Sequence, residues 1–204
     1  MNSSTLPTKN NLMRLKDNLR LSKQGRDLLE KKKIILNMEK IKYVKKAKEK
    51  KEELDIALQK AYQSYIQAVI ETGVDNLIDI SNGMSFGDVL DIKYKTIMGV
   101  EIPSIVYESK KAMLNYSLYD TTSSVDKTII DFNKVKDLII EYAELSNTII
   151  RLEKSIEKVS KRSNALGDMI IPQTEKNISE IQDILEERER EEFTRLKVIK
   201  NKIK

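Results

Sequence analysis

The chain has 204 residues, of which 34% are charged and only 5% are aromatic, and it carries a formal net charge of +5. It contains neither Cys nor His, which excludes disulfides, zinc fingers, thiolate chemistry and every catalytic arrangement that relies on an imidazole. With six Gly and three Pro among many Lys, Glu, Leu and Ile, the composition favours long helices over a compact enzyme domain.

The first predicted element is one long helix over residues 9–70. Apolar residues recur at helical spacing in three stretches, with a polar gap after the first. The seam positions are Leu12, Leu15 and Leu19, then Leu28, Ile35, Met38 and Ile41, then Leu54, Leu58, Ala61, Tyr65 and Ala68. The drift between the stretches indicates stutters within one continuous helix.

Within this helix, residues 31–51 form a basic stretch with ten Lys against two acidic residues. A basic helix can bind nucleic acid, and it can equally be the solvated face of a long helix. Tyr43 is the one aromatic residue between the lysines, so a stacking platform for single strands is not expected.

Residues 71–128 form a predicted central insert, which holds four of the six glycines. Polar and apolar residues alternate over 89–97, and Met98-Gly99 follows as a turn signal. We expect a small hairpin near 89–103, with a second strand over 100–102 that ends at Pro103, and short helical pieces beside it.

The last predicted element is a helix over residues 129–204. From Val135 onward a heptad seam is sustained at alternating steps of three and four residues. Its positions are Leu138, Tyr142, Leu145, Ile149, Leu152, Ile156, Val159, Ser163, Leu166 and Ile170. Near Pro172 we expect a bend, the alternative being that this proline opens a separate helix; the seam resumes beyond it.

Two long helices separated by a compact insert fold back most simply as an antiparallel pair. The predicted fold is therefore mainly α, a long antiparallel two-helix left-handed coiled coil with a small central insert that contains a short β-hairpin. The C-terminal helix is the longer of the two and should project past Lys9.

Several kinds of site are excluded by the motifs that the sequence lacks. Neither G-x-x-x-x-G-K-[ST] nor G-x-G-x-x-G occurs, so those routes to nucleotide binding are closed. No apolar run of about 18 residues could span a bilayer, and none resembles a signal peptide. We expect a non-catalytic, cytoplasmic chain with no cofactor, no metal and no direct membrane insertion.

Short motifs at both ends and in the centre resemble the D subunit of the V/A-type (vacuolar and archaeal-type) rotary ATPases. They are Pro7-Thr8-Lys9, Met98-Gly99-Val100-Glu101-Ile102-Pro103, Lys161-Arg162-Ser163-Asn164-Ala165-Leu166, Ile170-Ile171-Pro172 and Arg190-Glu191-Glu192-Phe193-Thr194-Arg195-Leu196-Lys197. They occur in the family's order and span the chain. Three parts of the chain depart from the pattern: Arg26 stands where the family has histidine, Gly167-Asp168 replaces a bulkier pair, and the segment from Glu39 to Lys60 matches poorly.

The resemblance implies a central-stalk rotor shaft that takes part in ion transport, including hydrogen ion transport, and in ATP synthesis or hydrolysis. The implied partners are the ring of catalytic and regulatory subunits (A and B), the small central-stalk F subunit and a socket subunit on the membrane ring. The implied location is cytoplasmic and peripheral to the membrane, and no nucleic acid partner is implied.

Polar residues near both termini, nearly all cationic, are the candidates for contact with the ring, because Arg can re-pair with changing carboxylate partners. The candidates are Lys9, Arg14, Lys16, Arg20, Lys161, Arg162, Asn164, Arg188, Arg190, Arg195 and Lys197. The alternative is ordinary surface charge that pairs with acids one helical turn away.

Two other functions stay open at this level. One is a static coiled-coil scaffold or spacer whose hairpin tip recognises a partner. The other is a nucleic-acid binder that uses the basic stretch.

Overall fold

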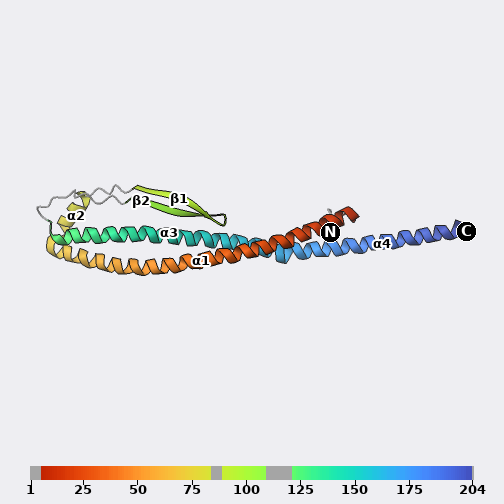
Figure 1. Ribbon diagram of the computed structural model, residues 1–204, viewed down its shortest axis with the longest axis horizontal. Coiled ribbons are helices and arrows are strands. Elements are labelled where there is room, and N and C mark those ends of the chain that lie inside the picture. Colours follow the sequence, from red (N-terminus) through yellow and green to blue (C-terminus); the bar gives the residue numbers. More distant parts are fainter. Residues whose placement is uncertain (1–5, 84–88, 109–120, 204) are drawn as a thin grey trace. The chain divides into compact units, whose positions relative to one another are not determined.

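The computed structural model describes residues 6–83, 89–108 and 121–203. The elements in chain order are α1 (Lys9–Thr72), α2 (Val74–Gly83), β1 (Val89–Ile97), β2 (Val100–Glu108), α3 (Ser123–Ala165), the π-helix η1 (Leu166–Ile170) and α4 (Ile171–Ile203) (Figure 1). The predicted fold class is confirmed, because the chain is mainly helical with a long helix pair and a two-stranded antiparallel insert. Its contacts divide it into a central unit, Leu36–Ser155, and a terminal unit, Met1–Ile35 with Ile156–Lys204.

In the central unit, α1 and α3 run antiparallel. Ser64 of α1 bonds to Asp131 of α3, whereas Lys50, earlier in α1, pairs with Glu141, later in α3. Leu54, Ala61 and Val135 are buried together, and five partly buried side chains pack around them. These are Ala57, Leu58, Phe132, Leu138 and Tyr142.

Small residues at heptad spacing let the two backbones approach each other in this unit. Ala47, Leu54, Ala61 and Ala68 are all buried, and three of these four are alanine. Tyr65, which the sequence pattern also assigned to the seam, is 40% exposed. A large aromatic side chain lies outside the seam where the helices pack closely.

The seam that the sequence predicted in the middle of α1 is partly wrong. Ile35, Met38 and Ile41 are 38%, 58% and 68% exposed, whereas Leu36 is fully buried. Polar residues take neighbouring interface positions, as Lys40 does by pairing with Glu153 at 2.7 Å. Lysine stems can cover apolar surface while their charge stays at the edge, so hydrophobicity alone gives the wrong phase here.

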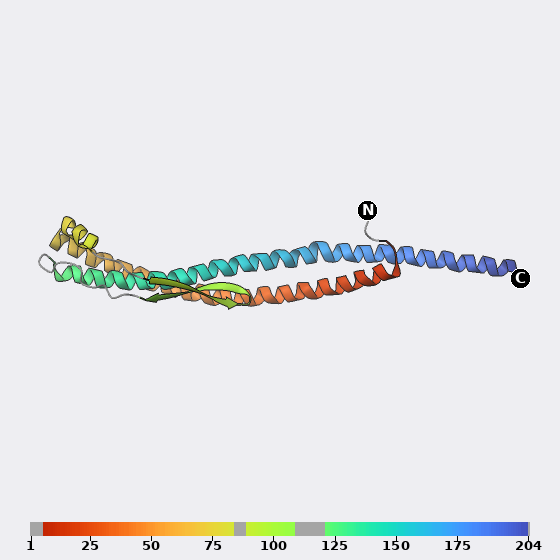
Figure 2. The same ribbon diagram turned by 90° about the horizontal axis from the view of Figure 1, so that it is seen from above.

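The insert contains the predicted hairpin, with a longer second strand than expected. Met98 and Gly99 have positive φ angles of 50° and 77°, which a two-residue type I′ turn requires. β2 continues through Pro103, which is opposite Tyr94, and ends at Glu108. Figure 1 shows the hairpin running alongside α3, and in the view of Figure 2 its strands overlap α1 and α3.

Local residues explain where α1 begins and ends. Thr8 caps its start, because the Thr8 hydroxyl accepts the backbone N–H of Asn11 at 3.3 Å. Gly73, with a φ of 81°, ends the helix at Thr72 and leads directly into α2.

In the terminal unit, α1 runs antiparallel to the chain that follows η1. Lys23 pairs with Glu175, and Lys9, earlier in α1, pairs with Glu189, later in α4. The apolar residues buried in this unit are Val159, Ile171, Ile178 and Ile181. The resumption of the seam beyond Pro172 agrees with the sequence prediction.

The π-helix η1 moves the seam by one residue. The sequence pattern places Ile170 in the seam, but its side chain is 46% exposed and Ile171 is buried instead, at 7%. The N–H of Ile171 bonds to the carbonyl of Leu166, a step of five residues that adds one residue to the turn. Helical backbone runs from α3 through η1 into α4 without a gap, and Pro172 is the second residue of α4. A bend at this point stays a prediction.

Candidate functional site: the interaction surfaces of the helix pair

The described residues 6–83, 89–108 and 121–203 contain no group of three or more acidic or other metal-binding side chains that could hold a metal ion. Hollows among them are shallow surface grooves, such as the one between Leu15, Gly25 and Leu166. Across the same ranges, no helix is both long and apolar enough to cross a membrane. The helix pair exposes apolar side chains along its length, and its surfaces are the candidate sites of function.

Near the start of α1 in the terminal unit, solvent-exposed polar contacts link this segment to α4. Lys9 Nζ lies 2.7 Å from Glu189 Oε1, and Arg188 donates to the carbonyl of Pro7 at 3.2 Å. The hydrogen bond and charge of Glu189 raise the pKa of Lys9, and Lys9 lowers the pKa of Glu189. Both side chains remain mostly exposed, at 79% and 61%, so water screens the pair.

Beyond this pair, α4 continues as an exposed helix with mixed chemistry. Every residue over 190–201 is exposed. Phe193 and Leu196 are 70% and 65% exposed, and Ile199 is 53% exposed. These apolar side chains alternate with cations and acids, so the stretch offers both apolar area and charge to a partner.

The structure divides the ring-contact candidates into three groups, the first being Lys9 and Arg188 with the contacts given above. Several pair with acids on their own helix, as the surface-charge alternative predicts. These pairs are Arg20 with Asp17, Lys161 with Glu157, Arg190 with Glu186 and Arg195 with Glu191. The others have exposed side chains: Arg14, Lys16, Arg162, Asn164 and Lys197.

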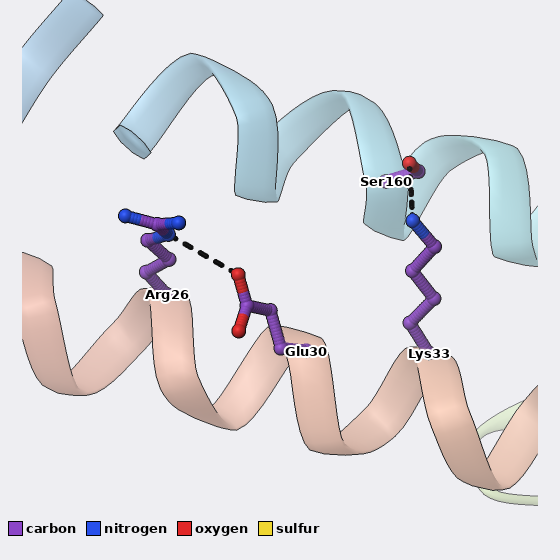
Figure 3. A network of polar contacts seen from close by, with 4 residues as sticks. All are labelled: Arg26, Glu30, Lys33 and Ser160. Carbon is purple, nitrogen blue, oxygen red and sulfur yellow. Dashed lines mark hydrogen bonds and ion pairs between the residues drawn. The ribbon is translucent and has the colours of Figure 1, made fainter. Parts of the chain in front are cut away.

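Figure 3 shows a polar network of the terminal unit that includes Arg26, which departs from the family pattern. Lys33 donates to the hydroxyl of Ser160 at 3.1 Å, and Arg26 pairs with Glu30 at 3.2 Å. A Cβ added to Gly167 would lie 3.2 Å from the guanidinium carbon of Arg26. Arg26 and Gly167, which both depart from the family pattern, therefore lie close together, and the glycine leaves room for the arginine.

The basic stretch contributes directly to the contacts between the helices. Lys33 reaches Ser160 in the terminal unit, and Lys40 reaches Glu153 in the central unit. Lys50 pairs with both Glu53 and Glu141, which raise its pKa. Three of the ten lysines are therefore held against the other helix, and the nucleic-acid interpretation of the stretch stays a hypothesis.

A buried polar contact in the central unit was not predicted from the sequence. Asp131 is 5% exposed; its carboxylate accepts a hydrogen bond from the Ser64 hydroxyl at 2.8 Å and lies 3.5 Å from Lys60 Nζ. The Ser64 hydrogen bond, and then the charge of Lys60, hold the pKa of Asp131 below its usual value. Such a pair forms in one register only, so it helps to set the pairing of α1 with α3.

Two residues of α3 hold the hairpin, and no sequence motif pointed to either. Glu144 accepts the backbone N–H of Ile105 at 2.8 Å. Arg151 donates to the carbonyl of Glu101 at 3.2 Å, and its guanidinium lies 5.2 Å from the ring centre of Tyr94. The hairpin is therefore attached to a rigid helix.

Comparison with known proteins gives these surfaces a context. A family profile that describes the D subunit of ATP synthase matches residues 11–201. The chain belongs to the ATP synthase D-subunit family. It is 36% identical over 200 residues to the D subunit of the V-type ATP synthase of Thermotoga neapolitana, with 98% of each chain covered.

Relatives from A-type ATP synthases are also D subunits. The D subunit of the A-type ATP synthase of Pyrococcus horikoshii is 36% identical over 197 residues, covering 95% of this chain and 92% of that protein. The corresponding protein of Methanopyrus kandleri is 32% identical over 199 residues, covering 97% and 86%. As a D subunit, this chain is a component of an ATP synthase complex, so its function depends on surfaces that contact other subunits.

Proposed function

We propose that this chain is the central rotor shaft of a V/A-type rotary ATPase. It is a non-catalytic subunit that transmits torque between the head that hydrolyses or synthesises ATP and the ion-translocating membrane ring. The observation that carries the proposal is membership of the D-subunit family over residues 11–201. The absence of Cys and His and the long helices are compatible with a mechanical role.

The physical requirements of a shaft are stiffness and a surface that can slide. Torque passes through paired helices only if they hold register, and the Ser64–Asp131 contact and the small-residue seam support this in the central unit. A rotating contact must also avoid deep interlocking. The shallow grooves and the exposed charges of the terminal unit are suited to that.

In this proposal the terminal unit contacts the ring of catalytic A and regulatory B subunits, with residues 190–201 of α4 as the principal surface. The candidate contacts with exposed side chains are Arg14, Lys16, Arg162, Asn164 and Lys197. Arg195 pairs only loosely with Glu191, at 3.9 Å, so it can exchange this partner for a ring carboxylate at little cost.

The central unit supplies the opposite contacts, with the small central-stalk F subunit and with the socket subunit of the membrane ring. The sequence holds no Lys or Arg over 61–92, and Val74 and Ile78 of α2 are 51% and 52% exposed. We assign the socket contact to this end of the unit, which lacks cations and exposes apolar side chains. The assembled protein is cytoplasmic and peripheral to the membrane.

The chain has no native cysteine, so a single introduced thiol gives a clean crosslinking test. In the assembled complex, the variants Arg195→Cys and Lys197→Cys, treated with a short thiol crosslinker, should each link to one catalytic subunit at a time. Because a tethered shaft cannot turn, the crosslink should stop ATP turnover, and reduction should restore it.

Asp79→Cys is the matched control, since Asp79 is an exposed residue of α2. It should not link to the ring subunits. If the Arg195→Cys crosslink forms fully while ATP hydrolysis continues at an unchanged rate, the chain does not rotate relative to the ring and the proposal is wrong.

A further inference from the structure

The hairpin has a hydrogen-bonding frame that follows from its turn. In a two-residue turn of this type the flanking residues, Ile97 and Val100, form a hydrogen-bonded pair. Bonded and non-bonded pairs then alternate along the antiparallel ladder. The N–H and C=O groups of every second residue therefore point away from the partner strand. On β2 these are Glu101, Pro103, Ile105 and Tyr107, and on β1 they are Leu90, Ile92, Tyr94 and Thr96.

Three of the four outward positions on β2 either contact α3 or lack an N–H. Glu144 accepts the N–H of Ile105, and Arg151 donates to the carbonyl of Glu101. Pro103 between them has no N–H to offer. The contacts at Ile105 and Glu101 fit the hydrogen-bonding frame given by the turn, and they place α3 beside the β2 edge. A strand added to β2 would have to replace these contacts.

The outer edge of β1 is open. Leu90 and Ile92 are 50% exposed, and Tyr94 is 58% exposed. Among residues 6–83, 89–108 and 121–203, no group hydrogen-bonds to the outward backbone atoms of these three residues. An exposed edge with apolar side chains and no proline is a template for an added strand. Because α3 contacts the β2 edge and the β1 edge is exposed, an added strand would pair with β1.

The charges along β1 indicate the chemistry of that strand. Lys93 and Lys95 lie on one face of β1, and Asp91 lies near Lys93 at 3.9 Å. Directly opposed opposite charges stabilise neighbouring strands, so acidic residues opposite the lysines fit best. A second copy would bring its own lysines to the shared edge together with its net charge of +5, which disfavours self-pairing.

We propose that the outer edge of β1, residues 90–96, is a strand-addition site for an extended segment of another subunit of the ATPase. That segment carries acidic residues opposite Lys93 and Lys95 and apolar residues on the face of Ile92 and Tyr94. The identification of the partner as an ATPase subunit rests on the proposed function. The open edge itself does not.

Residue-resolved amide hydrogen exchange on the isolated chain and on the assembled complex tests the site. The outward amides of Ile92 and Tyr94 should exchange at least about tenfold more slowly in the complex, because an added strand bonds to them. The inward amides of Lys93 and Lys95 already bond to β2, so they should change little. Equal exchange of the outward amides in both samples would overturn the proposal.

A pair of variants isolates the backbone contribution. Ile92→Pro removes one outward N–H, as Pro103 does on β2, whereas Ile92→Val keeps it and shortens the side chain slightly. Ile92→Pro should lower the occupancy of the partner subunit in the purified complex at least about tenfold, and Ile92→Val should leave it nearly unchanged. If Ile92→Pro retains full occupancy, no strand is added at β1.

If Ile92→Pro unfolds the hairpin, a variant that changes only side-chain charge provides a second test. Lys93→Glu combined with Lys95→Glu keeps the backbone intact and should also release the partner, whereas Asp91→Asn should not. Concentration-dependent dimerisation of the isolated chain that Ile92→Pro abolishes would assign the edge to a second copy and overturn the proposal. If this chain is absent from the purified ATPase altogether, the proposed function is what fails.

Discussion

The central and terminal units are both antiparallel helix pairs, but they differ in how many of their residues are buried. In the central unit, α1 contributes Leu36, Ala47, Leu54, Ala61, Ser64 and Ala68 to the buried set. In the terminal unit, no residue of α1 within the described range 6–35 is buried, although five residues over 156–203 are. One unit stabilises itself through a core, and the other keeps much of its apolar and charged surface exposed.

This contrast matches the proposed division of labour. A segment that must hold register buries its contacts, because buried contacts are strong and specific. A segment that must slide against changing partners keeps its charges in water, where each pair is weak and can be exchanged. The predictions below test that contrast, from the largest expected effect on stability to the smallest.

Removing a core side chain from the central unit should have the largest effect. Leu152 is fully buried, so Leu152→Ala should lower the free energy of unfolding by about 2–5 kcal/mol. Leu196→Ala is the matched control in the terminal unit, where the side chain is 65% exposed and the cost should stay within about 0.5 kcal/mol. Urea denaturation followed by circular dichroism measures both. Equal costs would remove the contrast between the units.

The buried Asp131 should make the central unit sensitive to acid. Its folded pKa lies below the ordinary value for an aspartate, so its contribution is present above that ordinary value and is lost as the pH falls through the folded pKa. Asp131→Asn should cost about 1–3 kcal/mol at neutral pH.

The cost of Asp131→Asn should shrink as the pH falls below the ordinary aspartate range, because the wild-type carboxyl then begins to take up a proton. The free energies of unfolding of the wild type and of Asp131→Asn should be measured between pH 6 and pH 2. This is roughly the range in which carboxyl groups titrate. A difference that stays constant over this range would show that the Asp131 carboxylate charge is not what stabilises the folded state.

The contact of Arg26 with Gly167 predicts a coupling in the terminal unit. Alanine is favoured over glycine in helices by about 1 kcal/mol, but here its Cβ would approach the Arg26 guanidinium at 3.2 Å. Gly167→Ala should therefore stabilise the Arg26→Ala protein more than the wild type, by about 0.5–1 kcal/mol. A double-mutant cycle from thermal melts measures this term, and strict additivity would contradict the prediction.

The exposed pair of Lys9 and Glu189 should have the smallest effect. Lys9→Met removes a contact whose partners are 79% and 61% exposed, and the midpoint of unfolding should not change measurably. Raising the salt concentration should likewise leave the wild-type midpoint unchanged. A clear loss of stability in Lys9→Met would mean that the terminal unit depends on its ion pairs.

The sequence by itself determined the long helices, the hairpin and the family. Helical periodicity marked both long segments, the Met98-Gly99 turn marked the hairpin, and most of the C-terminal seam from Leu138 to Leu166 is at least partly buried. These features follow from local preferences and from repeats within one segment, which a sequence displays directly. The placement of the ring contacts stays a prediction.

Only the tertiary structure decided which residues meet across the helices. Leu36 and Ile171 are buried in place of Ile35, Met38, Ile41 and Ile170, because lysine stems and a π-turn change the phase of the seam. The buried Ser64–Asp131 pair, and the contacts of Glu144 and Arg151 with β2, join residues far apart in the chain. A sequence does not show whether a polar residue will find a hydrogen-bond partner, because the partner comes from another segment that packs against it.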